Sequence, residues 1–192
     1  MGTGWKCYRI KLMNLFTSIS AMVCLSLSTA TARPQDATQS APLKAIAVLH
    51  PTQGNDVRGS ITFREVADGM RVEGEIKGLT PGKHGFHVHE FGDCSASDAG
   101  SAGDHFNPTN KPHGAAEDRE RHAGDLGNIE ADASGVAKVN FLDHTLSMFK
   151  GPPSIIGRSL VVHAKADDLK SQPAGDSGTR VACGVIGHAK SD

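Results

Sequence analysis

Aromatic residues are scarce in this chain of 192 residues, which contains one Trp, one Tyr and seven Phe. The Trp and the Tyr stand at positions 5 and 8, close to the N-terminus. Surfaces that bind nucleic acid rely on exposed aromatic rings and on an excess of basic charge. The formal net charge here is −1, so the composition argues against nucleic acid and against an anionic membrane surface as partners.

Long hydrophobic runs are also lacking outside residues 1–32. There, basic residues precede an apolar run that extends to Leu27, and Ala30-Thr31-Ala32 supplies the small residues of a cleavage site. This order predicts a secretory signal peptide over residues 1–32. Because Asn14 and Thr17 interrupt a run that is already short for a membrane span, we expect no stable membrane insertion; a membrane anchor is the alternative.

Cysteine is sparse as well. Two of the four cysteines, Cys7 and Cys24, fall within the predicted signal peptide, which leaves Cys94 and Cys183. Two cysteines in an exported chain predict one disulfide, with two buried free thiols as the alternative. Such a bridge closes a long loop and would stabilise the fold by about 4–5 kcal/mol. Three of the 20 Lys and Arg, but none of the 21 Asp and Glu, precede residue 33, so residues 33–192 carry a formal net charge of −4.

Sustained helical periodicity is missing too, and alternation of apolar and polar residues dominates instead. Residues 33–41 are polar and predict a flexible N-terminal segment, whereas residues 42–192 suit a single domain. Residues 70–77 alternate strictly, which is typical of a half-buried antiparallel strand, and Asp132-Ala133-Ser134-Gly135 predicts a hairpin turn. Further strands are expected around His87 and His89 and over residues 43–50, 60–66, 128–133, 136–142, 160–163 and 181–186.

About eight short strands separated by turns predict an all-β fold, an eight-stranded antiparallel Greek-key sandwich or flattened barrel. Two long irregular segments, residues 90–127 and 164–180, interrupt this pattern. Loops of that length are uncommon in a compact domain unless they carry function or are disordered. We therefore expect both to be functional loops.

Histidine is the residue that the chain has in excess, with ten copies. His87 and His89 are two residues apart in a predicted strand, so both side chains leave on the same face. Three imidazoles and one carboxylate suit a tetrahedral zinc site, whereas a nitrogen-only set favours copper. Seven residues form two four-ligand sites only if one histidine is shared. The remaining candidate ligands are His105, His113, His122, Asp125 and His163.

Five short motifs contain or adjoin these residues: His84-Gly85-Phe86-His87-Val88-His89-Glu90, His105-Phe106-Asn107-Pro108, Arg121-His122-Ala123-Gly124-Asp125-Leu126-Gly127, Gly157-Arg158-Ser159-Leu160-Val161-Val162-His163 and Arg180-Val181-Ala182-Cys183-Gly184-Val185-Ile186-Gly187. In this order they resemble the motifs of the copper/zinc superoxide dismutases, over roughly residues 43–189. The spacing of five residues between His89 and Cys94 is similar to that of bacterial members.

The resemblance implies two metal sites that share His105. One copper per subunit would bind His87, His89, His105 and His163, and one zinc per subunit would bind His105, His113, His122 and Asp125. Asp167 resembles the carboxylate that links a copper-binding to a zinc-binding histidine, here His87 and His113; alternatively Asp167 caps a turn and Asp168 is the functional partner. Cys94 and Cys183 resemble the family disulfide.

The implied reaction converts two superoxide anions and two protons to dioxygen and hydrogen peroxide. Copper cycles between two oxidation states, zinc is structural, His105 carries a proton, and Arg180 guides the anionic substrate. Residues 169–179 form a shorter loop than in many relatives, and Lys170 is a further candidate for steering. The chain would be an antioxidant enzyme of the cell envelope, secreted into the bacterial periplasm, with the extracellular space as the alternative.

Other readings remain open. A homodimer is expected, with a monomer as the alternative. A metal carrier that shares the fold but lacks turnover is one alternative function, and a mononuclear zinc hydrolase is another, although the latter needs an open zinc position. His84 is expected to be structural, and the charged run Glu117-Asp118-Arg119-Glu120-Arg121 is expected to be solvated loop.

Overall fold

The structure is a computed structural model that describes residues 44–190. The predicted signal peptide (1–32) and the predicted flexible segment (33–41) lie outside the described residues. The described part contains eight strands and one short 3-10 helix: β1 (Lys44–Pro51), β2 (Arg58–Val66), β3 (Gly69–Lys77), β4 (Gly82–His89), η1 (Gly100–Ala102), β5 (Asp125–Ala131), β6 (Val136–Asp143), β7 (Ser159–His163) and β8 (Arg180–His188).

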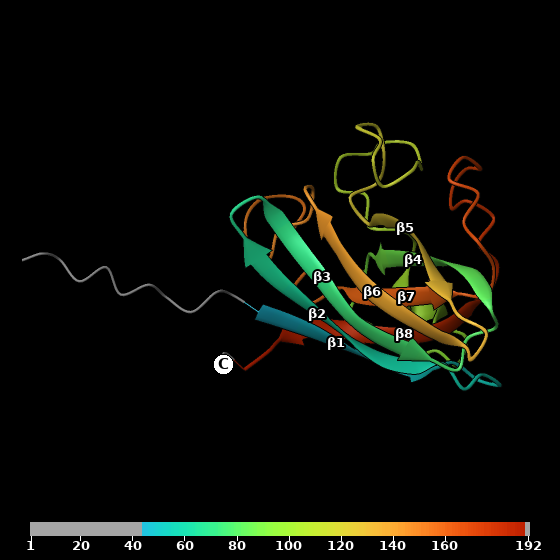
Figure 1. Cartoon of the computed structure of the whole chain (residues 1–192). Helices are drawn as coiled ribbons and strands as arrows, with labels where there is room; N and C mark the ends of the chain where they lie inside the picture. The colour runs from blue at the N-terminus through green and yellow to red at the C-terminus, as the bar shows by residue number, and fades with distance from the viewer. Residues whose placement is uncertain (1–43, 191–192) are drawn as a thin grey trace, which may run out of the picture. The chain divides into compact units, whose positions relative to one another are not determined.

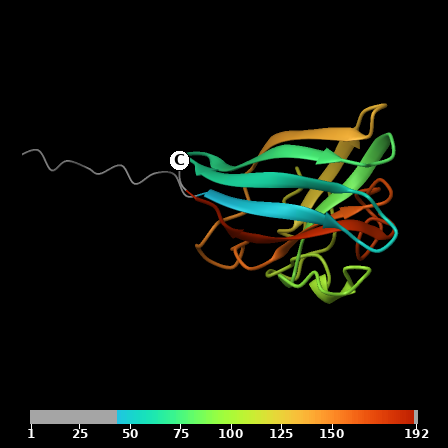
Figure 2. The same ribbon diagram turned by 90° about the horizontal axis from the view of Figure 1, so that it is seen from below.

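The strands close into one antiparallel barrel in the order β1-β2-β3-β6-β5-β4-β7-β8 (Figure 1). Strand β3 pairs with β6, and β4 pairs with β7, so two connections pass over neighbouring strands as in a Greek key. Figure 2 shows the same barrel from below. The predicted all-β, eight-stranded antiparallel fold is confirmed.

The alternation along β3 explains how the chain forms a barrel with one apolar interior. Met70, Val72 and Ile76 are fully buried, whereas Arg71 and Glu75 stay partly exposed. Most of the buried apolar side chains of the other strands join them in one core. The expected strand face is therefore confirmed.

Several strand boundaries differ from the expected ones, and at two of them pairing with a candidate ligand extends the strand. Strand β5 starts at Asp125 rather than at residue 128, since Asp125 pairs with His87 of β4 across a bulge. Strand β8 starts at Arg180, which pairs with His163 of β7. The hairpin turn between β5 and β6 is as predicted: the carboxylate of Asp132 accepts hydrogen bonds from the backbone N–H groups of Ser134 and Val136.

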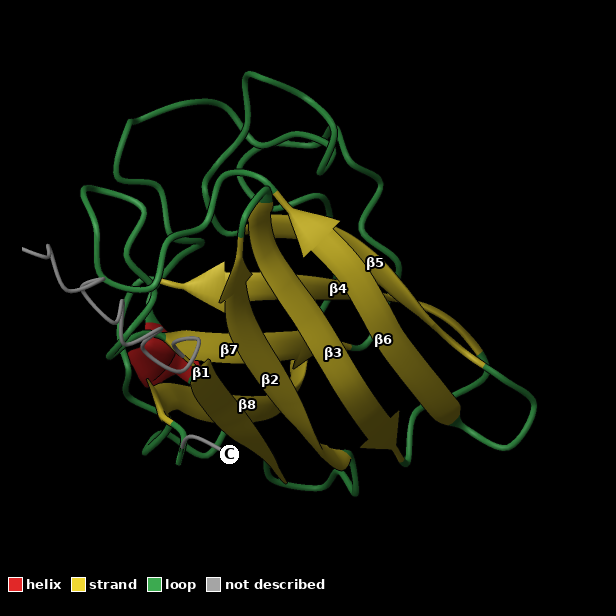
Figure 3. Ribbon diagram, turned by 60° about the vertical axis from the view of Figure 1, so that its left-hand side comes forward, coloured by secondary structure: helices red, strands yellow, loops and turns green. Residues whose placement is uncertain are grey.

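Two long loops, residues 90–124 and 164–179, extend from the same side of the barrel (Figures 1 and 3). Helix η1 belongs to the first loop, and its Ala102 packs together with the preceding Ala99 against Val161 of β7 and Cys183 of β8. The predicted disulfide joins Cys94 of this loop to Cys183. The loop is thus fastened to the last strand, beside the histidines of β4 and β7.

Candidate metal centre

Strand β4 carries two of the candidate ligands into the middle of the sheet, because it pairs with β5 on one side and with β7 on the other. His87 lies opposite Asp125 and Val161, and His89 forms an isolated bridge with His105 of the first loop. The strand therefore brings side chains from distant parts of the sequence to one place.

One group of possible ligands, which we call the strand set, consists of His87, His89, His105 and His163. All four are buried, and one ligand atom of each lies within 4.8 Å of those of the others. Nδ1 of His89 is 2.9 Å from the carbonyl oxygen of Gly103, and Nδ1 of His163 is 3.2 Å from that of Gly178. Their Nε2 atoms then face each other at 3.3 Å.

A second group, the loop set, consists of His105, His113, His122 and Asp125, and it is buried as well. Three imidazole nitrogens converge on one carboxylate oxygen, Oδ1 of Asp125. Nδ1 lies 2.8 Å away in His105, 3.1 Å in His113 and 3.2 Å in His122. The other oxygen, Oδ2, accepts hydrogen bonds from the backbone N–H groups of Gly114 and His122, which fixes the carboxylate.

These distances test whether zinc fits the loop set. Bonds of 2.0–2.1 Å in a tetrahedral site place neighbouring ligand atoms about 3.3 Å apart. The carboxylate-to-nitrogen distances of 2.8 to 3.2 Å lie close to that value. Buried nitrogens that lack a hydrogen-bond partner point to the same conclusion, because buried polar atoms normally have one. Among the described residues, Nδ1 of His113 and His122 are such atoms in the loop set. Nδ1 of His87 and Nε2 of His105 are such atoms on the side of the strand set, so the same observation fits a second metal there.

His105 belongs to both sets and uses its two ring nitrogens differently. Its Nδ1 faces Asp125, whereas its Nε2 lies on the side of the strand set and has no hydrogen-bond partner. The ring of His87 lies 4.0 Å from that of His105 between centroids. One imidazole can therefore serve two neighbouring metal ions.

The two sets differ in their electrostatics. Burial lowers the pKa of His105 to about 4 and that of His163 to about 3, and it lowers the pKa of His89 as well. Burial also disfavours the charged form of His113, but the nearby carboxylates of Asp125 and Asp167, the second hydrogen-bonded to Nε2, outweigh this effect and raise its pKa to about 9. The strand set therefore consists largely of neutral imidazoles, which is the form that binds metal.

Asp167 joins the two sets. Its Oδ2 accepts a hydrogen bond from Nε2 of His87 at 2.7 Å, and its Oδ1 accepts one from Nε2 of His113 at 3.0 Å. Asp168 instead caps a turn, because its Oδ1 accepts hydrogen bonds from the backbone N–H groups of Lys170 and Ser171. Of the two candidates, Asp167 has the contacts of a residue that fixes ligand orientation.

A cleft of about 760 Å³ leads to the strand set and is lined by His89, His105, His163 and Arg180, among others. The guanidinium of Arg180 donates hydrogen bonds to the carbonyl oxygens of Ala99 and Gly103, both at 2.6 Å. The disulfide-linked first loop thus holds this cation in place. Arg180 is the one basic side chain, Lys or Arg, among the described residues that line the cleft. Lys170, the further candidate for steering, does not line it.

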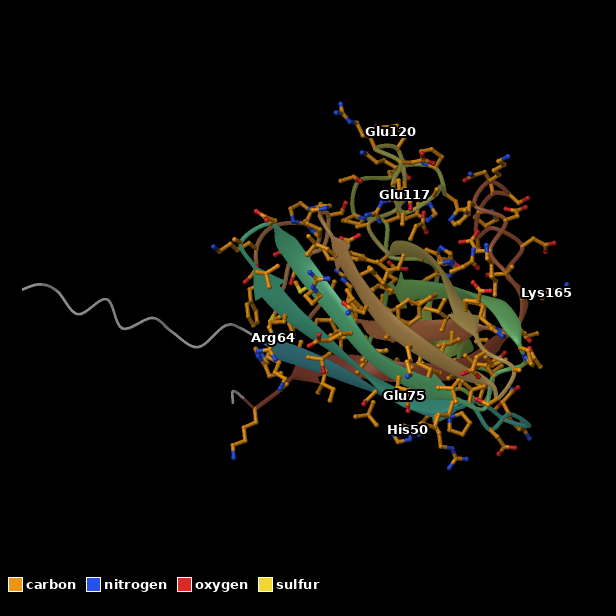
Figure 4. The ribbon with its side chains drawn as sticks, viewed as in Figure 1. His50, Arg64, Glu75, Glu117, Glu120 and Lys165 are labelled. Carbon is orange, nitrogen blue, oxygen red and sulfur yellow. A yellow bond between two sulfur atoms is a disulfide. The ribbon has the colours of Figure 1, made fainter. Side chains whose placement is uncertain are left out.

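The remaining histidines are separate from the two sets. Nδ1 of the buried His84 is 2.8 Å from the carbonyl oxygen of His163, and its Nε2 is 2.8 Å from that of Thr80, so its role is structural, as expected. His50, His144 and His188 are exposed. Figure 4 shows His50 at the bottom of the view, on the far side of the molecule from Glu117 and Glu120.

One expectation about the first loop is partly wrong. Glu117 and Glu120 are exposed at its tip, as expected of a solvated segment (Figure 4). Arg121, however, is buried and forms an ion pair with Asp143 at 2.6 Å. It also donates a hydrogen bond to the carbonyl oxygen of Asp125. The charged run gave no sign of this, because Asp143 lies 22 positions away and reaches Arg121 only in the folded barrel.

The sequence reasoning also missed two amide side chains. Asn128 bonds to the backbone of Asp167, and Gln172 bonds to the backbone of His113. Neither stands in a motif with a recognisable ligand pattern. Only the folded structure reveals them, because the second loop lies against Asn128 of β5 and against His113 of the first loop.

Comparison with known proteins agrees with this geometry. Residues 57–186 match the family model described as copper/zinc superoxide dismutase. The chain belongs to the copper/zinc superoxide dismutase family. It is therefore an oxidoreductase, a superoxide dismutase whose substrate is superoxide, as predicted.

The relatives of this superoxide dismutase include two nematode proteins. The extracellular superoxide dismutase [Cu-Zn] of Brugia pahangi is 51% identical over 151 residues, which cover 74% of each chain. A superoxide dismutase [Cu-Zn] of Onchocerca volvulus is 50% identical over 153 residues, which cover 74% of this chain and 94% of the relative.

Among solved structures, the clock protein EA4 is similar in fold, with a TM-score of 0.71 and 47% sequence identity over 78% of this chain and 97% of that one. Within residues 44–190, no helix is both long and apolar enough to span a membrane.

Proposed function

We propose that the strand set binds one copper ion and the loop set one zinc ion, and that the chain dismutes superoxide by copper redox cycling. The observation that carries this proposal is the convergence of two four-ligand groups on His105. The nitrogen-only strand set suits copper, and three nitrogens with one carboxylate suit a structural zinc. When bound, copper would take an electron from one superoxide anion and give it to a second.

The residues of the chain have distinct tasks in this reaction. Arg180 lies in the cleft with its guanidinium fixed by two carbonyl oxygens, so it can bind a small anion beside the strand set and offset its loss of hydration. His105 would hold a proton at Nε2 and pass it to the departing peroxide.

The proton balance requires two protons for two superoxide anions, with dioxygen and hydrogen peroxide as products. His105 supplies one proton in each cycle and recovers it from solvent, and water in the open cleft supplies the other. Asp167 keeps His87 and His113 in the orientation that leaves their other nitrogens free for metal.

We also propose that the protein is secreted after loss of residues 1–32 and protects the exterior of the cell or its envelope from superoxide. The similarity to a nematode protein named as extracellular favours the extracellular space over the bacterial periplasm. A homodimer is supported by the exposed side chains of Val48 and Val185, on the paired strands β1 and β8. Sedimentation of the metal-loaded protein tests this.

Metal analysis beside an activity assay tests the function. We expect one copper and one zinc per chain and rapid consumption of superoxide with formation of peroxide. Full occupancy by both metals without dismutation would favour the metal carrier. Replacing His163 should abolish turnover while zinc stays bound, because His163 belongs only to the strand set. Loss of zinc before copper in that variant would contradict the division of ligands.

A further inference from the structure

The two loops that carry the metal centre have few strand partners, and side-chain amides take over part of the role of a sheet. In three places one amide forms two reciprocal hydrogen bonds with the backbone of one other residue. Asn107 does so with Lys111, at 2.8 and 3.0 Å. Asn128 does so with Asp167, at 2.9 and 2.8 Å.

The third pair joins the two loops directly. Oε1 of Gln172, in the second loop, accepts a hydrogen bond from the backbone N–H of His113 at 2.8 Å, and its Nε2 donates to the carbonyl oxygen of His113 at 2.9 Å. The same Nε2 is 3.1 Å from the carbonyl oxygen of Lys170, which keeps the amide in this orientation. The amide thus bonds to both backbone groups of His113, as a residue of a neighbouring β-strand would.

These pairs fix both ends of one hydrogen bond. Nε2 of His113 donates to Oδ1 of Asp167, and the backbones of these two residues are the ones held by Gln172 and Asn128. The second loop also closes tightly over this bond. A Cβ atom on Gly175 would lie 1.8 Å from Oδ1 of Asp167 and 2.7 Å from Nε2 of His113.

We propose that Gln172 is a positioning residue for His113. By holding the backbone of His113 from the opposite loop, it sets the distance across the bond to Asp167 and aims Nδ1 of His113 at the loop set. The importance of this position for zinc rests on the function proposed above. Gln172 itself is exposed, so replacing it leaves the barrel core unchanged.

Two substitutions separate the contributions of the amide. Gln172→Leu removes both hydrogen bonds to His113 and the one to Lys170. Gln172→Glu keeps an acceptor for the N–H of His113 but loses the donor to its carbonyl oxygen. Lys170→Gln, in the same loop, leaves all three amide pairs intact and serves as the matched control. The first measurement is hydrogen exchange and NMR on the metal-free protein.

In the metal-free protein we expect exchange of the His113 backbone N–H to be about tenfold faster in Gln172→Leu, with a smaller increase in Gln172→Glu and none in Lys170→Gln. The Nε2–H resonance of His113, which reports the bond to Asp167, should broaden or shift in the same order. Unchanged exchange and an unchanged Nε2–H resonance in Gln172→Leu would overturn the proposal.

The second measurement is the transfer of zinc from the loaded protein to a chelator, with the visible spectrum of the cobalt(II)-substituted site as a record of ligand geometry. We expect transfer about tenfold faster in Gln172→Leu, at the low end of the range for groups that orient metal ligands. Wild-type transfer and an unaltered cobalt spectrum would also overturn the positioning role. A wild-type protein that takes up no zinc would instead refute the proposed function, and the metal-free NMR result would still decide the role of Gln172.

Discussion

Arg121 and Asp143 form a buried ion pair in which Nη2 lies 2.6 Å from Oδ2, with both side chains almost completely removed from solvent. Arg121 also donates to the carbonyl oxygen of Asp125 at 2.8 Å, and Asp143 accepts hydrogen bonds from the backbone N–H groups of Thr145 and Leu146. The pair therefore connects the end of β6 to the backbone of the loop set.

Loss of this pair should destabilise the protein strongly. Asp143→Asn leaves the buried guanidinium of Arg121 without a counter-charge, and we expect the free energy of unfolding to fall by about 3–5 kcal/mol. Urea unfolding of the metal-free protein measures this. The exposed pair between Glu75 and Lys77, at 2.9 Å, provides a control, because Glu75→Gln should cost about 1 kcal/mol or less. Equal effects of the two substitutions would contradict the role given to burial.

Asp167 and Asp168 should differ sharply in their influence on metal binding. Asp167→Asn replaces one of two acceptor oxygens by a donor, so either His87 or His113 loses its hydrogen bond. We expect zinc affinity to fall by about 10–100-fold, measured by competition with a chelator. Asp168→Asn perturbs only a turn and should leave the affinity within about twofold of wild type. The reverse result would return the linking role to Asp168.

The stability of the metal-free protein should pass through a maximum near pH 6.5. Burial lowers the pKa of His105 to about 4 and that of His163 to about 3, so the unfolded chain takes up protons first and stability falls as the pH drops below about 6.5. Asp125 and Asp167 raise the pKa of His113 to about 9 against the effect of burial, so its contribution is lost as the pH rises from about 6.5 to 9.

The midpoint of urea unfolding between pH 4 and pH 9.5, with the disulfide intact, measures both limbs. His113→Gln should flatten the alkaline limb and leave the acid limb in place. A midpoint that rises steadily to pH 9 in the wild-type protein would show that His113 is not a protonated partner of Asp125 and Asp167.

Replacing Arg180 should slow catalysis without removing copper. In Arg180→Ile the cleft loses a fixed positive charge, and we expect kcat/KM to fall by about tenfold or more, with a weaker dependence on ionic strength. Stopped-flow kinetics at several salt concentrations, with copper content measured in parallel, gives the answer. Arg180→Lys keeps the charge but cannot bond to both Ala99 and Gly103 in the same way. Its kcat/KM should therefore lie between the values of the wild-type protein and of Arg180→Ile. An unchanged rate in Arg180→Ile would exclude anion guidance.

Local pattern made much of this fold predictable. The alternation over residues 70–77 and the turn at residues 132–135 depend on neighbours in the sequence, and both are as expected. The start of β5 at Asp125 was not predictable, since it depends on pairing with His87 across a bulge. A pairing partner from another strand is invisible in the alternation of a single segment.

The same division applies to the candidate centre. The candidate ligands could be predicted because imidazole and carboxylate groups are common metal ligands and are recognisable from the residue type alone. His87 and His89 also share a strand face. Arg121 could not be assigned, because its partner Asp143 is the last residue of β6, 22 positions further along the chain. Gln172 and Asn128 were missed for a related reason. Their amides act through hydrogen bonds to the backbone of another segment, and the sequence does not show which segment lies beside them.

The position of the ligands along the chain sets an order for assembly. The loop set spans residues 105–125, whereas the strand set spans residues 87–163, and Arg180 comes later still. Bringing together the ends of a short segment costs less conformational entropy than closing a long one. During synthesis the four groups of the loop set emerge before the strand set is complete. A nascent chain can thus gather the loop set before the strand set is complete, and Arg180 emerges last.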